Sequence, residues 1–265
     1  MDIGLSGKSV IVTGGTRGIG RGISEELLAE GAKVTACFGS DHEEAQRFLD
    51  ANSAAQNEGR LIIFAANLSE ERDHERLLDT AKEKFQTLDG IVNCAAIKVP
   101  ENDLTLRNLS AMAIVNGIGP VALTYRALDY FNNSGGAVVN ILTVLKNVYY
   151  PESPMSRAMA HHGASKGYLE TASRLMTDEC QRYRVRVNCV APGPTRGGGL
   201  SKSDTVHQER FRKGQYAMNR RSEIQDVTGA VLYLLSPISE QITGQTIYVT
   251  GGQELAPFFY PPQET

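Results

Sequence analysis

The sequence contains no tryptophan and only four cysteines, and the cysteines follow no recognisable pattern. They stand far apart, without a Cys-x-x-Cys pair or a regular spacing to the five histidines: Cys37, Cys94, Cys180 and Cys189. This distribution argues against a disulfide framework and against a metal site. We therefore expect reduced, buried thiols in a reducing compartment, and no bound metal.

Net charge and long apolar runs are also scarce. The 27 basic and 30 acidic residues give a formal net charge of −3, so the chain as a whole does not attract nucleic acid or anionic membranes. The N-terminus lacks the basic segment and apolar run of a signal peptide, and no stretch approaches the roughly 18 apolar residues that span a bilayer. We expect a cytoplasmic protein that binds a small-molecule substrate, with neither nucleic acid nor membrane as its partner.

Short β-branched runs alternate with longer amphipathic stretches along the chain. The runs, which we interpret as strands, are residues 9–13, 33–37, 60–65, 90–93, 137–141, 185–190 and 246–249. The amphipathic stretches, which we interpret as helices, are residues 20–29, 71–85, 108–130, 163–183 and 224–235. About seven strands separated by helices predict one Rossmann-type α/β domain over residues 1–265, with a doubly wound parallel sheet covered on both faces.

Three segments fall outside this rhythm. Residues 146–162 and 194–221 each follow a predicted strand, and ligands of such sheets bind beyond the carboxyl ends of strands, so we expect these loops to form the substrate walls. Successive glycines at 197–199 suit the hinge of a lid. The basic residues later in the loop 194–221 indicate either an anionic substrate or a solvated helix face. The tail 254–265 is apolar, aromatic and rich in proline, so we expect it to pack against a second subunit of a homodimer or homotetramer.

A glycine-rich turn follows the first predicted strand and precedes the first predicted helix. A pyrophosphate needs a tight turn, a close backbone approach and helix N-terminal N–H groups, so side chains must be absent at Gly14, Gly18 and Gly20. We expect Thr16 and Ile19 of the same turn to contact the nucleotide as well. The turn therefore predicts a dinucleotide site.

Five motifs together carry a family resemblance. Residues 13–20 read TGxxxGxG, residues 93–96 read NCAA, Asn116 lies within a predicted helix, Pro-Gly at 192–193 follows the sixth strand, and residues 242–252 contain TGQ and VTGG. From about Leu5 to Gly252 the chain resembles the short-chain dehydrogenase/reductase family. The resemblance implies an oxidoreductase whose cofactor contacts include Asn93, Ala95, Pro192 and Gly193, Asn67 and Leu68 on the adenine ring, and Thr195 on the nicotinamide carboxamide.

The end of the second predicted strand indicates which cofactor is bound. NAD enzymes carry an acidic residue there, which binds the ribose hydroxyls and repels a 2′-phosphate; this chain has Phe38, followed by Gly39 and Ser40. Arg17 in the glycine-rich turn adds a cation that can pair with the phosphate. We therefore predict NADP(H), with the alternative that Arg17 faces solvent and Asp41 takes the acidic role.

Hydride transfer to a carbonyl builds negative charge on oxygen, so a proton donor, a hydroxyl and a cation are needed around it. In the family these are the Tyr of a YxxxK motif, a Ser after the fifth strand, and the Lys of the same motif, with a helical Asn completing a proton relay. The resemblance places Lys166, Asn116 and Thr143 at the Lys, Asn and Ser positions. His162 stands where the tyrosine is expected.

His162 leaves several proton sources open. Beside the Lys166 ammonium, its pKa should fall below the usual value near 6.5, which leaves mostly neutral imidazole at pH 7. The minor imidazolium form is a strong acid, so His162 either donates the proton or only fills the space of the tyrosine. The alternatives are His161, Tyr149 or Tyr150, or a substrate that needs no protein acid, such as an imine or an unsaturated carbonyl.

We therefore expect an NADP(H)-dependent oxidoreductase that reduces a C=O, C=N or activated C=C bond of a small molecule, as in specialised biosynthesis. Two alternatives use the same fold. One is a non-redox dehydratase or isomerase with His162 as its base, and the other is a non-catalytic NADP-binding sensor or subunit.

Overall fold

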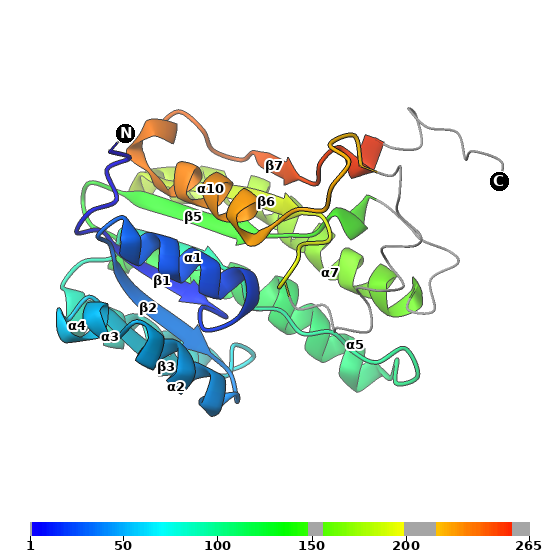
Figure 1. The fold of residues 1–265 in the computed structure, drawn as a ribbon, viewed down its shortest axis with the longest axis horizontal. Helices are drawn as coiled ribbons and strands as arrows, with labels where there is room; N and C mark the ends of the chain where they lie inside the picture. The colour runs from blue at the N-terminus through cyan, green and yellow to red at the C-terminus, as the bar shows by residue number, and fades with distance from the viewer. Residues whose placement is uncertain (1, 148–155, 199–215, 256–265) are drawn as a thin grey trace.

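The computed structural model describes residues 2–147, 156–198 and 216–255 and contains one seven-stranded parallel sheet (Figure 1). The strands lie in the order β3-β2-β1-β4-β5-β6-β7. Their bounds are β1 (Ser9–Thr13), β2 (Lys33–Phe38), β3 (Leu61–Ala65), β4 (Gly90–Asn93), β5 (Gly136–Ile141), β6 (Val185–Pro192) and β7 (Thr246–Val249). The predicted α/β class and its parallel sheet are confirmed.

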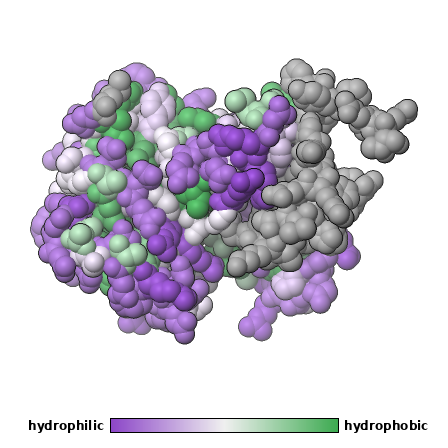
Figure 2. Space-filling view, viewed as in Figure 1, coloured by the Kyte–Doolittle hydropathy of each residue, from purple (hydrophilic) through white to green (hydrophobic). Residues whose placement is uncertain are grey.

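Helices cover both faces of the sheet. In chain order they are α1 (Gly18–Ala29), α2 (His42–Ala51), α3 (Ser53–Asn57), α4 (Glu71–Phe85), α5 (Leu106–Ala113), the π-helical turn η1 (Ile114–Ile118), α6 (Gly119–Ala127), η2 (Leu128–Tyr130), η3 (Val144–Lys146), α7 (Ser156–Leu175), α8 (Thr177–Cys180), η4 (Gln181–Tyr183), α10 (Ile224–Leu235), η5 (Pro237–Ser239) and η6 (Gln253–Leu255). α1 and α10 lie side by side in front of the sheet (Figure 1). On the face shown in Figure 2 most described residues are hydrophilic, with hydrophobic residues in small areas between them.

α7 begins earlier than the sequence predicts. Its first residue is Ser156, so the prediction of a loop over 146–162 is wrong for residues 156–162. Glu101 stabilises the early start, because its carboxylate accepts the N–H of Ala158 at 2.7 Å. It also pairs with Arg157 at 2.7 Å. This cap comes from a segment far away in the sequence, which a local pattern does not reveal.

α2 and α3 are additions to the predicted set. α2 begins at a cap, since Asp41 accepts the N–H of Glu44 at 3.1 Å. Its buried residues are few, Ala45 and Phe48. A helix with so narrow an apolar face gives a weak periodic signal.

Alternate side chains of each central strand enter opposite faces of the sheet. On β1, Val10 and Val12 belong to the cluster beneath α1 and α10, whereas Ile11 belongs to the cluster beneath α4 and α6. All three are at most 1% exposed, and each such burial contributes about 1.5–3 kcal/mol to stability. β1 is therefore fixed on both faces at the centre of the sheet.

The strand order reverses between β1 and β4, and this reversal opens a crevice at the carboxyl ends of the strands. Thr13 and Asn93 end these two strands as register partners. The Thr13 hydroxyl accepts the N–H groups of Cys94 at 3.0 Å and Ala95 at 3.1 Å. The Thr13 side chain thus joins the ends of β1 and β4 at the floor of the crevice.

The segment Leu106–Tyr130 is long and apolar enough to cross a membrane by length and composition alone. The segment is not a run of about 18 apolar residues, however, since Asn116, Thr124 and Arg126 interrupt it. Half of its apolar window is buried inside the protein, where Leu123 and Ala127 join the core beneath the sheet. Packing in the core accounts for its composition.

Two helical glycines give a matched test of the packing between α1 and α10. A Cβ on Gly229, in α10, would meet no atom within 4 Å, whereas a Cβ on Gly22, in α1, would lie 2.1 Å from Cγ2 of Ile224. We expect Gly229→Ala to stabilise the protein by about 0.5–1 kcal/mol and to raise Tm by roughly 2–4 °C. Gly22→Ala should lower Tm because α1 and α10 must separate. Equal shifts in calorimetry would show that the two helices do not pack as described.

Candidate active site

The glycine-rich turn between β1 and α1 is packed too closely for side chains. Gly14 and Gly18 have φ angles of 66° and 55°, in the left-handed region that favours glycine. A Cβ on Gly20 would lie 2.1 Å from the carbonyl oxygen of Gly14, and Thr16 in the turn is 2% exposed. α1 begins without a capping side chain, which leaves its first N–H groups available to an anion.

The opposite wall of the crevice follows β6, which ends at Pro192. The Thr195 hydroxyl donates to the carbonyl of Gly193 at 3.0 Å. A Cβ on Gly198 would lie 3.4 Å from Cδ1 of Ile19, so this wall touches the glycine-rich turn. Predicted contacts from distant parts of the chain therefore meet at one edge of the sheet.

The end of β2 carries the predicted selectivity residues. Phe38 is 8% exposed and meets the ring of His42 edge-on at 5.2 Å between centroids, while Ser40 is exposed. The Arg17 guanidinium lies 3.9 Å from the carboxylate of Asp41, and the two side chains are 68% and 50% exposed. An exposed pair of this length is weak, so Arg17 remains available to a phosphate.

Asn67 and Leu68 follow β3 in a hydrogen-bonded turn. The Asn67 side-chain oxygen accepts the Ser69 N–H at 3.2 Å, and the Asn67 N–H donates to Asp73 at 2.7 Å. Leu68 is 8% exposed, and its carbonyl lies 3.0 Å from the Nε2 of His74. These bonds hold the turn at the carboxyl edge, where an adenine contact is predicted.

Asn93 and Ala95 lie at the end of β4. A Cβ on Gly14 would lie 3.0 Å from the Cα of Ala95, so the two backbones are in close contact. The Asn93 amide instead donates to Asn140 at 2.8 Å, and Asn140 donates to Ser173 at 2.8 Å. Asn93 therefore stiffens the sheet beneath the crevice.

α7 and η1 bring three of the four predicted catalytic residues together. His162 and Lys166 on α7 are 8% and 2% exposed, and Asn116 on η1 is fully buried. The Asn116 Nδ2 lies 3.2 Å from Nδ1 of His162 and 3.2 Å from the hydroxyl of Ser165. The Ser165 hydroxyl donates to the carbonyl of His162 at 2.7 Å.

Thr143 follows β5 on the adjoining strand end. Its oxygen accepts the N–H of Leu145 at 3.3 Å, which leaves its own proton to donate. Three residues later, Lys146 pairs with Glu170 of α7 at 2.8 Å. This buried ion pair ties the turn of Thr143 to the helix that carries Lys166.

The hydrogen bonds of Asn116 determine the tautomer of His162. The N–H of Ile97 donates to the Asn116 oxygen at 2.8 Å, so the amide nitrogen must be the atom that faces the imidazole. That nitrogen donates to the Ile97 carbonyl at 3.0 Å and to His162. This arrangement favours Nδ1 of His162 as an acceptor, with the ring proton of the neutral imidazole on Nε2.

His162 is neutral at physiological pH. Burial is the main cause that lowers its pKa to about 3, and the charges of Lys166 and Lys98 lower it further. At pH 7, four units above that pKa, only about one imidazole in 10⁴ carries a second proton. The neutral form expected from the sequence is thus strongly favoured, and the imidazolium donor is much rarer than expected.

The Lys166 ammonium has no hydrogen-bond partner among residues 2–147, 156–198 and 216–255, although the residue is only 2% exposed. Burial lowers its pKa to about 8 against the opposing effects of Cys94 and Cys189. A buried ammonium without acceptors is unfavourable. A ligand with hydroxyl oxygens, such as the ribose of a nucleotide, would supply them.

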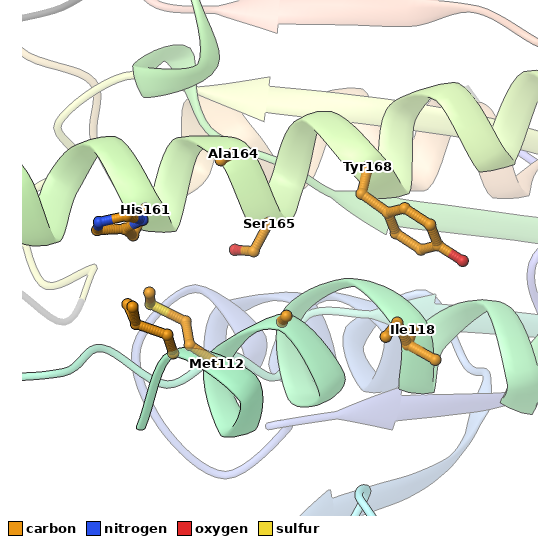
Figure 3. Close-up of a pocket in the computed structure, with 8 residues that line it drawn as sticks. Met112, Ile118, His161, Ala164, Ser165 and Tyr168 are labelled. Atoms are coloured by element: carbon orange, nitrogen blue, oxygen red, sulfur yellow. The ribbon is translucent and has the colours of Figure 1, made fainter. Parts of the chain in front are cut away.

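His161 lies on the exposed side of α7. It lines a groove in which Met112 lies on the facing helix (Figure 3). The adjacent His162 is buried. Two other candidate donors lie outside the described residues: Tyr149 and Tyr150.

The predicted site residues did not include the buried polar residues Ser165, Arg221 and Gln253. Ser165 lies three residues after His162, a spacing that places both on one helix face and that could have revealed it. Arg221 and Gln253 are 6% and 2% exposed. No sequence signal distinguishes them, because arginine and glutamine are usually on the surface.

Known oxidoreductases are similar to this chain over nearly its full length. Residues 14–254 match the family model described as enoyl-(acyl carrier protein) reductase. Glucose 1-dehydrogenase 2 of Bacillus subtilis (strain 168) is 29% identical over 260 residues, which cover 96% of this chain and 97% of the relative.

Two solved structures with NADP are similar in fold and sequence. The angucycline C-6 ketoreductase LanV, solved with bound NADP, has a TM-score of 0.81 at 29% identity, with 95% of this chain and 97% of that chain covered. A short-chain dehydrogenase from Burkholderia cenocepacia J2315 in complex with NADP has a TM-score of 0.82 at 27% identity, with coverages of 94% and 98%.

The tautomer and pKa of His162 can be measured directly. In ¹⁵N-histidine NMR, we expect the His162 signals, identified by their loss in His162→Gln, to show a protonated Nε2 and an unprotonated Nδ1. They should stay unchanged from pH 8 to pH 4.5, since the pKa is about 3. A titration near the usual pH of 6.5 would contradict the buried, neutral imidazole.

Proposed function

The chain belongs to the short-chain dehydrogenase/reductase family, and from this premise we propose that it is an NADP(H)-dependent oxidoreductase. Its reaction is hydride transfer to a C=O, C=N or activated C=C bond of a small molecule, as in specialised biosynthesis. The observation that carries the proposal is the Lys166 ammonium, which is buried in the group with Asn116 and His162 and has no hydrogen-bond partner among the described residues.

The residues at the carboxyl edge of the sheet fit NADP(H), which supplies the hydride when it is bound. The uncapped N–H groups of α1 suit its pyrophosphate, Lys166 suits its ribose hydroxyls, and Arg17 suits its 2′-phosphate. The NADP held by LanV and by the Burkholderia dehydrogenase supports this assignment. The other proposed contacts are Gly14, Thr16, Gly18, Ile19, Phe38, Ser40, Asn67, Leu68, Asn93, Ala95, Pro192, Gly193 and Thr195.

The proposed roles of the catalytic residues follow from their charges and protons. Negative charge that develops on the acceptor oxygen receives hydrogen bonds from the Thr143 hydroxyl and the Nε2–H of His162. Lys166 provides the positive charge beside them. Since the imidazolium is rare, His162 holds the oxyanion and solvent supplies the final proton. Asn116 fixes the imidazole in the tautomer that donates from Nε2.

The charge of the site favours oxygen acceptors among the three bond types. An iminium substrate carries a positive charge that the nearby Lys166 ammonium repels, whereas a ketone or unsaturated carbonyl develops the negative charge that this cation stabilises. The same pKa of about 3 makes His162 a weak base. This argues against the dehydratase or isomerase alternative, in which His162 removes a proton.

A cytoplasmic homodimer or homotetramer is part of the proposal. The groove between α5 and α7 is lined by two exposed apolar side chains, Ile118 and Tyr168, which a second subunit would cover. The C-terminal residues 256–265, expected at a subunit contact, lie outside the described residues. A monomer in light scattering at micromolar concentration would contradict this assembly.

Lys166 gives the cofactor proposal a pH signature. The ammonium is protonated below its pKa of about 8 and loses its charge above it, so NADPH should bind more weakly as pH rises through 8. A hydrogen bond from a charged group contributes about 1.5–3 kcal/mol, so Lys166→Met should weaken NADPH binding by roughly 10–100-fold at pH 7. Lys166→Arg is the matched control, because it keeps its charge and should bind without the change near pH 8. Wild-type affinity that is flat from pH 6.5 to 9.5 in calorimetry would contradict the assignment.

The reaction itself is tested by following deuterium from NADPH labelled at C4 into simple ketones and enones by mass spectrometry. We expect transfer by the wild type and at least tenfold higher kcat/KM for ketones in His162→Tyr, because a phenol beside the Lys166 ammonium can donate its proton. His161→Tyr, on the exposed side of α7, should leave the rate unchanged. Tight NADPH binding without transfer by either protein would instead favour the non-catalytic sensor or subunit.

A further inference from the structure

Arg221 is a buried arginine with no counter-ion among the residues that the structure describes. Only 6% of its surface is exposed, and none of its Nε, Nη1 and Nη2 atoms has a hydrogen-bond partner in the described ranges. Its neighbour Arg220 is the opposite case, since it binds Asp226 through two nitrogens, one at 2.8 Å, and is 54% exposed. Of these two adjacent arginines, Arg220 has a carboxylate partner, and Arg221 has none among the described residues.

Gln253 is a second buried polar side chain without partners. It is 2% exposed, and both polar atoms of its amide, Oε1 and Nε2, lack a hydrogen bond within the part of the chain that the structure describes. It follows β7 in the short helix η6. A Cβ on Gly193 would lie 3.3 Å from its Oε1, so the amide lies against the loop that follows β6.

The backbone around Arg221 borders the same loop. Ser222 forms a parallel bridge with Thr195, and its hydroxyl donates to the Val249 carbonyl at 3.1 Å. The carbonyl of Arg220 would lie 3.4 Å from a Cβ on Gly251. The segment that carries Arg221 therefore runs between the loop after β6 and the turn that leads to Gln253, at the carboxyl edge where ligands of this fold bind.

An unpaired guanidinium in this environment needs an anion. Burying a charge without a partner is strongly unfavourable, and proteins normally pair or expose it. The described carboxylates nearest to it in the sequence are engaged elsewhere: Glu223 pairs with Arg196 at 3.4 Å, and Asp226 pairs with Arg220. Close to Gln253, Glu254 accepts the hydroxyl of Thr250.

We propose that Arg221 and Gln253 form a substrate subsite that binds a carboxylate. The planar guanidinium matches the two oxygens of a carboxylate, and the amide nitrogen of Gln253 adds a third donor. Its oxygen is left to accept a hydroxyl or amine of the same molecule. The subsite extends the proposed function: the reducible group lies toward Lys166 and His162, and an acidic group on the substrate lies toward the Arg221 wall.

The subsite can be tested on the full-length protein without a known substrate. Benzoate serves as the probe, with benzamide as its uncharged analogue and inorganic phosphate as the competing anion. At tenfold its Kd, benzoate should raise the wild-type Tm by roughly 3 °C, while benzamide and phosphate do not. Arg221→Leu should abolish the shift, and Gln253→Leu should weaken benzoate binding several-fold. The control Arg220→Leu should retain it.

The stability of the unliganded variant is an independent readout. Because Arg221→Leu replaces an unpaired buried charge with an apolar side chain, we expect its Tm without ligand to equal or exceed that of the wild type. A lower Tm than that of Arg220→Leu would show that Arg221 has a structural partner, and would overturn the proposal. So would a benzoate shift that survives in Arg221→Leu, or a larger shift with phosphate than with benzoate.

NADPH binding separates this inference from the proposed function. Arg221→Leu should change the Kd for NADPH by less than twofold, and a tenfold loss would assign Arg221 to the cofactor site and overturn the carboxylate subsite. If wild-type protein binds benzoate through Arg221 but does not bind NADPH, the proposed function fails while the anion site stands. If it binds NADPH but shows no benzoate shift, only the subsite fails.

Discussion

Burial of the Lys166 ammonium is the constraint on which the rest of the candidate site depends. Lys166 is 2% exposed and finds no acceptor for its protons in the described parts of the chain, and burial lowers its pKa to about 8. The same charge adds to the burial that holds the pKa of His162 at about 3. One desolvated cation therefore creates the need for a ligand rich in oxygen acceptors, and it adds to the burial that keeps the neighbouring imidazole neutral.

The glycine-rich turn and Asn116 keep their positions independently of the side chain at position 162. The glycine-rich turn acts through backbone contacts, such as the approach of Gly20 to the carbonyl of Gly14, and these do not depend on the residue at position 162. Asn116 is held by both backbone groups of Ile97, so it stays in place whether a phenol or an imidazole faces it. The backbone of the glycine-rich turn and the side chain of Asn116 are thus held independently of the residue at position 162, where the family resemblance leads us to expect a tyrosine.

Features that depend on local sequence patterns were predictable from the sequence. The β-branched runs predicted all seven strands, and the spacing of His162 and Lys166 placed them on one helix face. Features set by distant contacts were not: the carboxylate of Glu101 caps α7 from 57 residues away, and the burial of Arg221 depends on how strand ends meet. The NADP(H) prediction from Phe38 and Arg17 agrees with the NADP held by similar structures, although the nearness of Arg17 to Asp41 required coordinates.

α5, η1 and α6 form one continuous helical rod. The π-helical turn η1 turns the side chains of the second half of this rod relative to those of the first half. A π turn holds one residue more than an α turn, and each extra residue rotates the remainder of the helix by about 100°. Met112, before the turn, lines the groove beside α7, whereas Leu123, after it, packs beneath the sheet, and Asn116 within it meets His162. The number of residues in this rod is thus constrained as tightly as their identity, because losing one would place the two halves in phase and turn one apolar stripe away from its neighbour.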